Sequence, residues 1–384
     1  MLINAIAAVT LLIWIYLLAG RGGFWRVSRS LARAMPPITP AKPVVAVIPA
    51  RNEAAAIRET VTSLLRQEFP APVHIIVVDD GSIDATAELA LAAAERAGKA
   101  SLLTVITGIP LPAGWTGKLW AVAQGVAEAE TLAPDYLLLS DADIHHGPQN
   151  LAGLVATAQS GGYDLASYMV KLACVTTAEK ALIPAFVFFF LKLYPPAWIR
   201  TQKRKTAGAA GGCILIRPEA LRRIGGIEAI RDEMIDDCAL ARAVKGSGGR
   251  IWMGLTNESE SVRSYGSFRE IGRMVSRTAF NQLRHSGLLL AATVLGISVM
   301  YLLPPLLLLT RRKVPMTLGG AVWLVMSVSY FPMVRFYKRS GAWGLALPLI
   351  ATFYMGATIH SAVQYWRGRG GEWKGRFQDI LLPG

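Results

Sequence analysis

The distribution of apolar residues divides the chain into two membrane-like ends and a central zone. Residues 2–19 contain no charged side chain, and three more apolar stretches follow at 287–309, 317–334 and 342–363. Each stretch is long enough to cross the hydrocarbon core of a bilayer as a helix. We therefore expect an N-terminal transmembrane anchor at 1–20 and about three transmembrane helices within 286–365.

The central zone, residues 42–285, alternates between strand and helix patterns. Short runs rich in β-branched and other apolar residues predict strands at 44–50, 74–80, 102–106, 136–139 and 213–216. The stretches between the first four predict helices at 53–67, at about 84–97 and from about residue 118. This alternation is typical of βαβ units in a parallel sheet, so we expect one α/β domain of Rossmann-like class.

Polar side chains gather where three of these strands end. The three strand tips are Ala50-Arg51-Asn52-Glu53, Asp79-Asp80-Gly81-Ser82 and Asp141-Ala142-Asp143. In a doubly wound sheet such tips lie side by side and form the ligand crevice. There Asp79 or Asp80 could accept hydrogen bonds from a nucleobase or a ribose, and Lys118 offers a cation to a diphosphate. The glycine patterns of dinucleotide folds and P-loops are missing, which argues against both classes.

Asp141 and Asp143 are the first candidates for a metal site. They follow the strand at 136–139 and are two positions apart, so they share one face if the chain stays extended. Carboxylate oxygens suit Mg²⁺ or Mn²⁺, which usually completes its shell with water and substrate phosphates. A strand followed by an Asp-rich turn is the simpler alternative.

Composition narrows the class of protein. The chain is 53% hydrophobic with a mean hydropathy of +0.38, which is too apolar for an ordinary soluble enzyme. Its net charge of +14 suits anionic lipid headgroups or phosphorylated substrates, and no nucleic-acid-binding motif is recognised. The distant Cys174, Cys213 and Cys238 indicate neither a disulfide framework nor a zinc site.

Basic residues predict which side of the membrane the domain faces. A juxtamembrane linker at 21–41 contains Arg21, Arg26, Arg29 and Arg33, which places it in the cytoplasm. We therefore expect a multi-pass protein of the inner (cytoplasmic) membrane with its α/β domain in the cytoplasm. A cleaved signal peptide is the alternative for the first segment. Four crossings would put the basic tail, 366–384, outside, which conflicts with the same rule.

A second apolar region lies inside the central zone, at about 181–205. Its stretch 181–198 is strongly aromatic but contains Pro184, Lys192 and Pro195-Pro196, and basic residues follow it. This pattern predicts an interfacial or re-entrant segment that could bring a membrane lipid to the domain. A buried core helix is the alternative. Gly211-Gly212, shortly after, would allow the close backbone approach of an acceptor pocket.

In their order along the chain, these motifs resemble those of a known enzyme family. Together with Gly211-Gly212 and Asp236-Asp237, the three strand tips and Gly117-Lys118 resemble the family 2 glycosyltransferases of GT-A fold over about residues 42–285. With its membrane ends, the chain is more similar to the hopanoid-biosynthesis-associated glycosyltransferases than to cellulose or chitin synthases.

The resemblance implies a role for each matched residue. The region of Asp80 would hold the base and ribose of a nucleotide-diphosphate sugar, with a UDP-sugar as the first candidate. Asp141 and Asp143 would supply the metal site, with Asp143 as the direct ligand. Asp237 would be the inverting general base, supported by Asp236, which stands where the family has Glu. Arg277 would be retained from the motif of processive members, whose Gln and Trp are missing here, and this favours transfer of a single sugar.

Chemistry gives independent support to Asp237. Inverting transfer needs a carboxylate that takes the proton of the acceptor hydroxyl. Asp236 and Asp237 precede a predicted helix at 238–245, whose amide dipoles would stabilise their ionised forms. An ordinary helix cap is the alternative, and His145 and His146 are rival bases.

Two other functions remain open. A sugar nucleotidyltransferase on a similar fold would use the same strand tips without needing Asp237. A catalytically inactive membrane scaffold would need none of these carboxylates. The sequence therefore favours a membrane-bound glycosyltransferase acting on a lipid acceptor.

Overall fold

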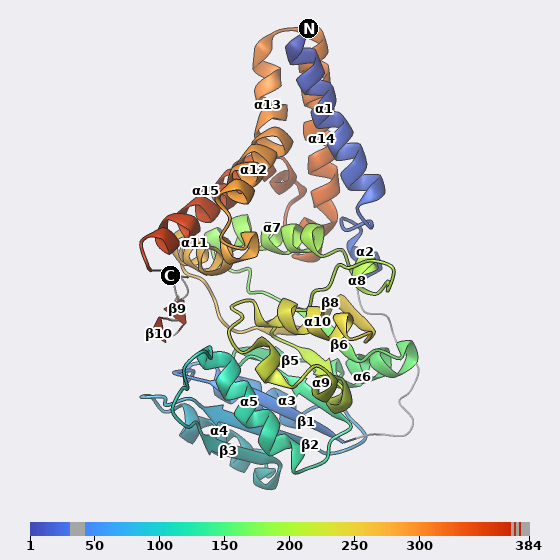
Figure 1. Ribbon diagram of the computed structural model, residues 1–384. Coiled ribbons are helices and arrows are strands. Elements are labelled where there is room, and N and C mark those ends of the chain that lie inside the picture. Colours follow the sequence, from blue (N-terminus) through green and yellow to red (C-terminus); the bar gives the residue numbers. More distant parts are fainter. Residues whose placement is uncertain (31–42, 370–371, 374–375, 378–384) are drawn as a thin grey trace.

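The computed structural model describes residues 1–30, 43–369, 372–373 and 376–377. Most of the predicted linker and tail, residues 31–41 and most of 370–384, lies outside the described part. Figure 1 shows an α/β domain at one end of the molecule and a tapering group of helices at the other. The N-terminus lies at the narrow apex of this helical cone.

One sheet of eight strands organises the α/β domain, in the order β3-β2-β1-β4-β7-β6-β8-β5. The strands β1, β2, β3 and β4 run parallel to one another, as the βαβ pattern predicted. Beyond β4 the sheet is mixed, because β7 is antiparallel to both β4 and β6. The strands are β1 (Val44–Ala50), β2 (Val73–Asp79), β3 (Leu103–Thr107), β4 (Tyr136–Leu139), β5 (Ile144–His146), β6 (Leu165–Lys171), β7 (Ile214–Ile216) and β8 (Ile251–Ser261).

Helices cover both faces of the sheet. Alternate residues of β1 enter two different cores: Val44, Ala46 and Ile48 pack with α3 and α4, whereas Val45 and Val47 pack with α5. The helices of this domain are α3 (Ile57–Leu65), α4 (Thr86–Arg96), α5 (Gly117–Glu130), α6 (Asn150–Gly161), α9 (Pro218–Arg223) and α10 (Asp236–Gly246). The predicted strands and helices are therefore confirmed, with ends that shift by a few residues.

Glycine brings α5 unusually close to the sheet. A Cβ atom on Gly125 would lie 2.5 Å from a methyl group of Val47 and 2.9 Å from one of Val78. No larger side chain fits there unless the helix moves. Because α5 begins at Gly117, this contact also fixes the position of Lys118, in its first turn.

The helical cone is built from both ends of the chain. It contains α1 (Leu2–Gly20), α12 (Gly287–Ile297), a π-helical turn (Ser298–Leu302), α13 (Leu303–Leu307) and α14 (Lys313–Phe336). By length and apolar composition, four stretches of the described chain could each cross a membrane: Leu2–Gly20, Thr177–Ile199, Gly287–Thr310 and Lys313–Phe336. The expected stretch at 342–363 is not among them.

The remaining helices lie at the base of the cone, next to the α/β domain (Figure 1). They are α2 (Val27–Ser30), α7 (Thr177–Leu193), α8 (Pro196–Ile199), α11 (Phe268–Thr278) and α15 (Leu347–Trp366). Helix α15 packs against α11 and the π-helical turn and ends on the side of the α/β domain. A short hairpin of β9 (Glu372–Trp373) and β10 (Arg376–Phe377) follows.

Helix α7 is continuous despite Pro184 and runs across the base of the cone. Thr176 and Glu179 form a capping box at its start. Phe188 is only 1% exposed and packs on Phe24 and Tyr330, with ring centroids 5.2 and 5.1 Å away. This packing favours the buried-core reading of this segment.

Candidate active site

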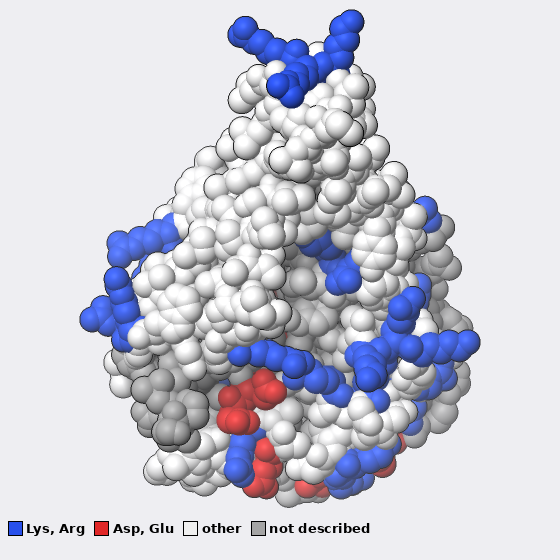
Figure 2. All heavy atoms as spheres, turned by 45° about the horizontal axis from the view of Figure 1, so that its top comes forward, with Lys and Arg blue, Asp and Glu red and all other residues white. Residues whose placement is uncertain are grey.

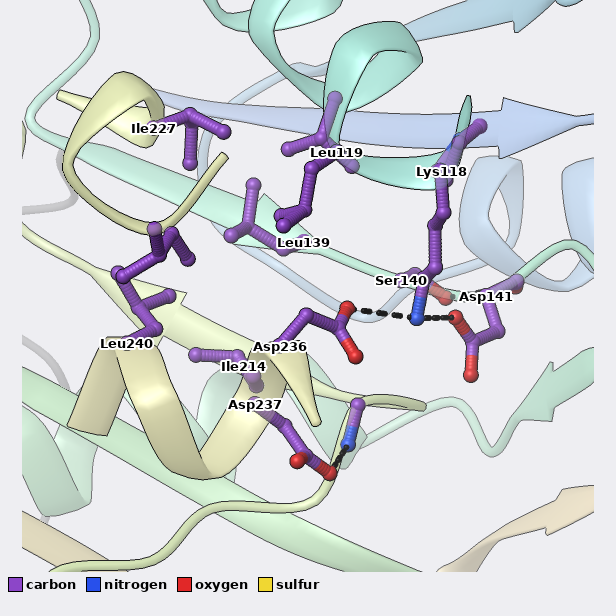
Figure 3. Close-up of a pocket in the computed structure, with 14 residues that line it drawn as sticks. Lys118, Leu119, Leu139, Ser140, Asp141, Ile214, Ile227, Asp236, Asp237 and Leu240 are labelled. Carbon is purple, nitrogen blue, oxygen red and sulfur yellow. Dashed lines mark hydrogen bonds and ion pairs between the residues drawn. The ribbon is translucent and has the colours of Figure 1, made fainter. Parts of the chain in front are cut away.

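Lys118 joins two carboxylates from different parts of the chain. Its Nζ lies 2.8 Å from Oδ1 of Asp141, after β4, and 2.9 Å from Oδ2 of Asp236, at the start of α10 (Figure 3). Burial alone would lower the pKa of Lys118, but the two carboxylates raise it above its usual range. The lysine is therefore a permanent cation at the centre of the site.

Asp237 is held by the backbone. Its Oδ2 accepts a hydrogen bond from the Gly211 N–H at 3.0 Å, and its Oδ1 accepts one from the Cys238 N–H at 2.6 Å. Burial and the neighbouring Asp236 carboxylate raise the pKa of Asp237 to about 6. A carboxylate with this pKa is a stronger base than an exposed aspartate and is still ionised at neutral pH.

Gly211 and Gly212 allow the backbone to approach this site. A Cβ on Gly211 would lie 3.4 Å from Lys118 Nζ and 3.7 Å from Asp237 Oδ2, and one on Gly212 would meet Val170 at 2.9 Å. A side chain at Gly211 would therefore intrude between the charged groups. These glycines support the site by leaving space and, at Gly211, by donating an amide hydrogen.

Asp143 is surrounded by negative charge. Burial and the carboxylates of Asp141 and Glu53 raise the pKa of Asp143 to about 6, while Arg263 and Lys118 oppose that rise. Its carbonyl accepts a hydrogen bond from the Val262 N–H at 2.9 Å, which ties this loop to the end of β8.

The donor set fits a divalent cation that is shared with a substrate. Within the part of the chain that the structure describes, no group of three His, Cys, Asp or Glu side chains could hold a metal alone. Mg²⁺ commonly uses one or two carboxylates and completes its shell with phosphates and water. Asp143 and Asp141 meet that smaller requirement, and a cation there would relieve their mutual repulsion.

The first two strand tips are bonded to each other. Arg51 donates to the Asp80 carbonyl and lies 3.7 Å from the Asp80 carboxylate, which is nearly inaccessible to solvent. Asn52, with φ of 52°, donates its N–H to Ser82 Oγ at 3.0 Å and accepts the Ile83 N–H at 2.9 Å. Asp79 Oδ1 accepts the Ser82 N–H at 2.9 Å. Ser82 thus joins the first two strand tips through hydrogen bonds to Asn52 and Asp79. It does not cap α4, which begins at Thr86.

A cavity of about 1400 Å³ extends from these carboxylates toward the base of the cone. Its walls include Asp141, Asp143 and Asp236 on one side and α11 and α15 on the other. Helix α11 contributes three arginines spaced four residues apart, and the middle of α15 contributes apolar residues. The residues of these two helices that line the cavity include Arg269, Arg273, Arg277, Phe353, Gly356, Ala357 and His360.

The structure therefore brings together most of the predicted site. Glu53, Lys118, Asp141, Asp143, Asp236 and Arg277 line the cavity. Asp237 and Gly211 lie just behind them, lining a smaller cavity that shares Lys118, Asp141 and Asp236. Ala50, Arg51, Asn52, Asp79 and Asp80 build the neighbouring strand tips, where Asp80 serves as a partner of Arg51.

The two histidines lie elsewhere. His145 Nδ1 is 2.6 Å from Glu59, and the buried His146 contacts Ser140 Oγ at 2.9 Å. Burial and the adjacent His145 lower the pKa of His146 to about 3. Neither histidine lines the cavities that contain the carboxylates, so both are poor candidates for the base.

Sequence reasoning missed Arg263 and Tyr265, which follow β8 and line the main cavity. Their segment, Val262–Gly266, has no recognisable motif. Its one signal is a polar stretch after a strand, the same signal that marked the three earlier tips. Because β8 itself was not predicted, that signal could not be used.

Comparison with known proteins agrees with this geometry. Residues 45–225 match the family model described as glycosyl transferase family 2. The undecaprenyl-phosphate 4-deoxy-4-formamido-L-arabinose transferase of Serratia proteamaculans is 31% identical over 131 residues, which are 33% of this chain and 37% of that protein. The uncharacterised protein MJ1222 of Methanocaldococcus jannaschii is 31% identical over 32% of this chain and 44% of its own length. The chain thus matches less than half the length of these relatives.

Among solved structures, the mannosyltransferase PcManGT of Pyrobaculum calidifontis, in complex with GDP-Man and Mn²⁺, is similar along nearly the whole chain. The match covers 95% of this chain and 99% of that one, with a TM-score of 0.53 and 19% identity. This likeness shows a shared fold. Residues 45–225 therefore match the glycosyl transferase family 2 domain, and they lie on an α/β fold of the GT-A type.

Proposed function

We propose that this protein is an inverting glycosyltransferase that moves one sugar from a nucleotide-diphosphate sugar to a lipid acceptor. The proposal rests on one observation, the cluster of Lys118, Asp141, Asp236 and Asp237. The first three line one end of a cavity that continues to α15, and Asp237 lies directly behind them. Lys118 and the carboxylates that could hold a metal lie on one side of this cavity, and α11 and α15 from the base of the cone lie on the other side.

The donor is assigned to the strand tips. Lys118 and Arg277 provide positive charge for the diphosphate, and the bonded tips at Arg51–Glu53 and Asp79–Asp80 form the wall beside it. A UDP-sugar is the first donor to test, although the solved relative contains GDP-Man. Asp143 and Asp141 would hold Mg²⁺ or Mn²⁺, and the ion, when bound, would neutralise charge that builds on the departing diphosphate.

Asp237 is assigned the role of general base. Its raised pKa and its fixed position suit removal of the acceptor hydroxyl's proton as the hydroxyl oxygen attacks the anomeric carbon. The nucleoside diphosphate leaves from the opposite face of the sugar, which inverts the configuration. Asp236, which pairs with Lys118 at 2.9 Å, would support this base.

A lipid acceptor is favoured by the far wall of the cavity. Phe353, Gly356 and Ala357 of α15 offer an apolar surface beside the arginines of α11. Several relatives are named as undecaprenyl-phosphate transferases, which agrees with a polyprenyl-type acceptor. A polycyclic acceptor in hopanoid or related lipid biosynthesis is the narrower form of the proposal.

The arrangement of helices also suggests a membrane orientation. If α1, the stretch from α12 to α13, and α14 cross the inner membrane, the catalytic domain, α15 and the basic tail all lie on the cytoplasmic side. This removes the conflict found in the sequence, because α15 then need not cross. No nucleic acid partner is expected.

One experiment tests the proposal against its rivals. Purified membranes would be incubated with a panel of nucleotide sugars and a lipid extract, and the released nucleoside diphosphate and glycosylated lipid would be measured. We expect release that depends on both donor and lipid. Pyrophosphate release from a nucleoside triphosphate and a sugar phosphate would instead indicate a nucleotidyltransferase, and no turnover with any donor would indicate a scaffold.

A further inference from the structure

A second cavity, of about 1080 Å³, lies apart from the catalytic one and shares none of its lining residues. It is located where α14 ends on the α/β domain, and α2, β6 and β8 complete its walls. Four of its lining residues are cations, one is an acid and two are aromatic rings that each underlie a cation: Arg26, Lys171, Arg335, Lys338, Glu260, Trp25 and Phe336.

Among the described residues, the positive charges of this cavity outnumber the negative ones. Glu260 is the register partner of Lys171 across β6 and β8, and it leaves a surplus of three positive charges. Among the residues that the structure describes, no ion pair within 4.0 Å engages any of the four cations. Instead Lys171 Nζ lies over the rings of Phe336 and Tyr337, 5.3 and 5.9 Å from their centroids. The half-buried Lys171 ammonium is therefore placed where an anion in the cavity could pair with it.

The backbone at Lys338 is a second, independent observation. Lys338 follows α14 with φ of 55°, a left-handed conformation that favours glycine at this position of a helix end. The Lys338 N–H donates to the Arg335 carbonyl at 2.9 Å, and the Arg339 N–H donates to the Val334 carbonyl at 3.0 Å. These bonds form the helix-ending motif in which glycine is usual. A lysine here costs stability and gains a cation in the cavity.

We propose that this cavity binds a phosphoryl group, at a site separate from the catalytic one. Each of the two arginines can donate two parallel hydrogen bonds to phosphate oxygens, and the two lysines add positive point charges. The group can come from the headgroup of an anionic phospholipid or from free phosphate. The apolar residues of α14, Pro332 and Phe336, lie in the same wall and favour a lipid whose chains run beside that helix.

The distribution of charged side chains on the surface agrees with a site at the level of the lipid headgroups. Figure 2 shows the cone largely without charge, with Lys and Arg at its tip and around its base. The cavity belongs to this base, beside the end of a helix long enough to cross a membrane. The lipid source rests on the proposed membrane placement, whereas the phosphoryl site itself does not depend on glycosyl transfer.

The test measures binding and not turnover. The full-length protein in neutral detergent would be titrated with short-chain phosphatidylglycerol, with phosphatidylcholine of equal chain length, and with inorganic phosphate, while its melting temperature is followed. We expect phosphatidylglycerol to raise the melting temperature and phosphatidylcholine to leave it unchanged. Stabilisation by inorganic phosphate to the same extent would assign the site to a free phosphate.

Variants make the test specific. Lys338→Gly should melt at the same or a higher temperature without ligand, because glycine suits its backbone, yet bind phosphatidylglycerol about fivefold more weakly. Adding Lys171→Gln should weaken binding about fivefold again. The control pair Lys203→Gln and Lys205→Gln removes two exposed lysines from the loop before β7, outside the cavity. An equal loss in this control, or an equal response to both lipids, would overturn the proposal.

Discussion

At the scale of single residues, the adjacent Asp236 and Asp237 have different electrostatic surroundings. Asp236 faces the Lys118 cation at 2.9 Å, whereas Asp237 accepts hydrogen bonds from the backbone N–H groups of Gly211 and Cys238. Burial and the neighbouring Asp236 carboxylate together raise the pKa of Asp237 to about 6. This difference suits a supporting role for Asp236 and a proton-accepting role for Asp237.

Replacing Asp237 by Asn should lower the transfer rate about 10²- to 10⁴-fold, because a positioned base contributes that much. Binding of the nucleotide sugar, measured by calorimetry, should survive. Asp236→Asn should cost less. His145→Ala is the control and should be close to wild type, since His145 pairs with Glu59 outside the cavities.

The same assignment predicts a pH dependence. A base works only when deprotonated, and the raised pKa of Asp237 puts its half-ionisation near pH 6. In saturating Mg²⁺, kcat/KM should therefore fall tenfold for each unit of pH below about 6, and Asp237→Asn should lose this acidic limb. Near-normal turnover by the variant, with an unchanged profile, would remove Asp237 from the mechanism.

The metal assignment gives a separate expectation. Asp143→Ala, or chelation by EDTA, should abolish transfer while the protein stays folded and in the membrane. Because removing Asp143 also relieves its repulsion with Asp141 and Glu53, the melting temperature without metal should not fall. Full activity in metal-free buffer would contradict the metal site.

Most residues of the candidate site could be predicted because they follow local rules. Parallel strands end at one edge of a sheet, so Glu53 and Asp141 could be placed together from their positions alone. Arg263 and Tyr265 could not. They reach the cavity because β8 pairs with β6, a contact between segments about 86 positions apart that leaves no local pattern.

At the scale of elements, α7 shows why an apolar segment was ambiguous. Its sequence is apolar enough to cross a membrane, but the helix lies across the base of the cone and packs against α11, α14 and α15. Tyr354 Oη, on α15, donates to the Leu182 carbonyl at 2.9 Å. The helix thus supports the two helices, α11 and α15, that line the candidate cavity. Apolar composition alone does not distinguish such packing from contact with lipid.

Phe188→Ala should therefore act through stability. Loss of a large buried aromatic side chain typically costs about 3–5 kcal/mol in soluble proteins, so a clear drop in melting temperature is expected. Transfer to lipid and hydrolysis of the donor should fall together. Phe190→Ala, at a half-buried position of the same helix, is the control and should cost less. Selective loss of lipid transfer in Phe188→Ala would restore the acceptor role of this segment.

The order and direction of the strands were predictable only in the first half of the sheet. Strands β1 to β4 and their helices repeat in order along the chain, and this repetition signals a parallel sheet. In the second half β7 enters antiparallel between β4 and β6, and β8 joins beside β6. These pairings come from tertiary contacts and not from a repeated unit.

At the scale of the whole molecule, the cone has dimensions that suit a bilayer. At 1.5 Å per residue, α14 is about 36 Å long and α1 about 28 Å, close to the thickness of the hydrocarbon core. Three basic residues, Arg311, Arg312 and Lys313, are exposed where α13 meets α14 at the apex. More basic residues surround the base, which agrees with the proposed orientation of this end toward the cytoplasm under the positive-inside rule.

Single cysteines can test this orientation in intact cells. Arg312→Cys, at the apex, should react with a membrane-impermeant thiol reagent added outside. Ser340→Cys, exposed after α14, should react only after the cells are opened. Background labelling should be small because Cys213 and Cys238 are buried and Cys174 is half-buried. The reverse pattern would place the catalytic domain outside.

The cavity shared by the catalytic carboxylates and α15 has a kinetic consequence. A donor would reach it by diffusion in three dimensions, whereas a lipid acceptor would reach it by diffusion in the plane of the bilayer. The rate should then follow the mole fraction of acceptor in the membrane and not its amount per volume. In vesicles, adding inert phosphatidylcholine at constant total acceptor should slow turnover, while the KM for the nucleotide sugar stays constant. A rate that is insensitive to this dilution would mean that the acceptor enters from water.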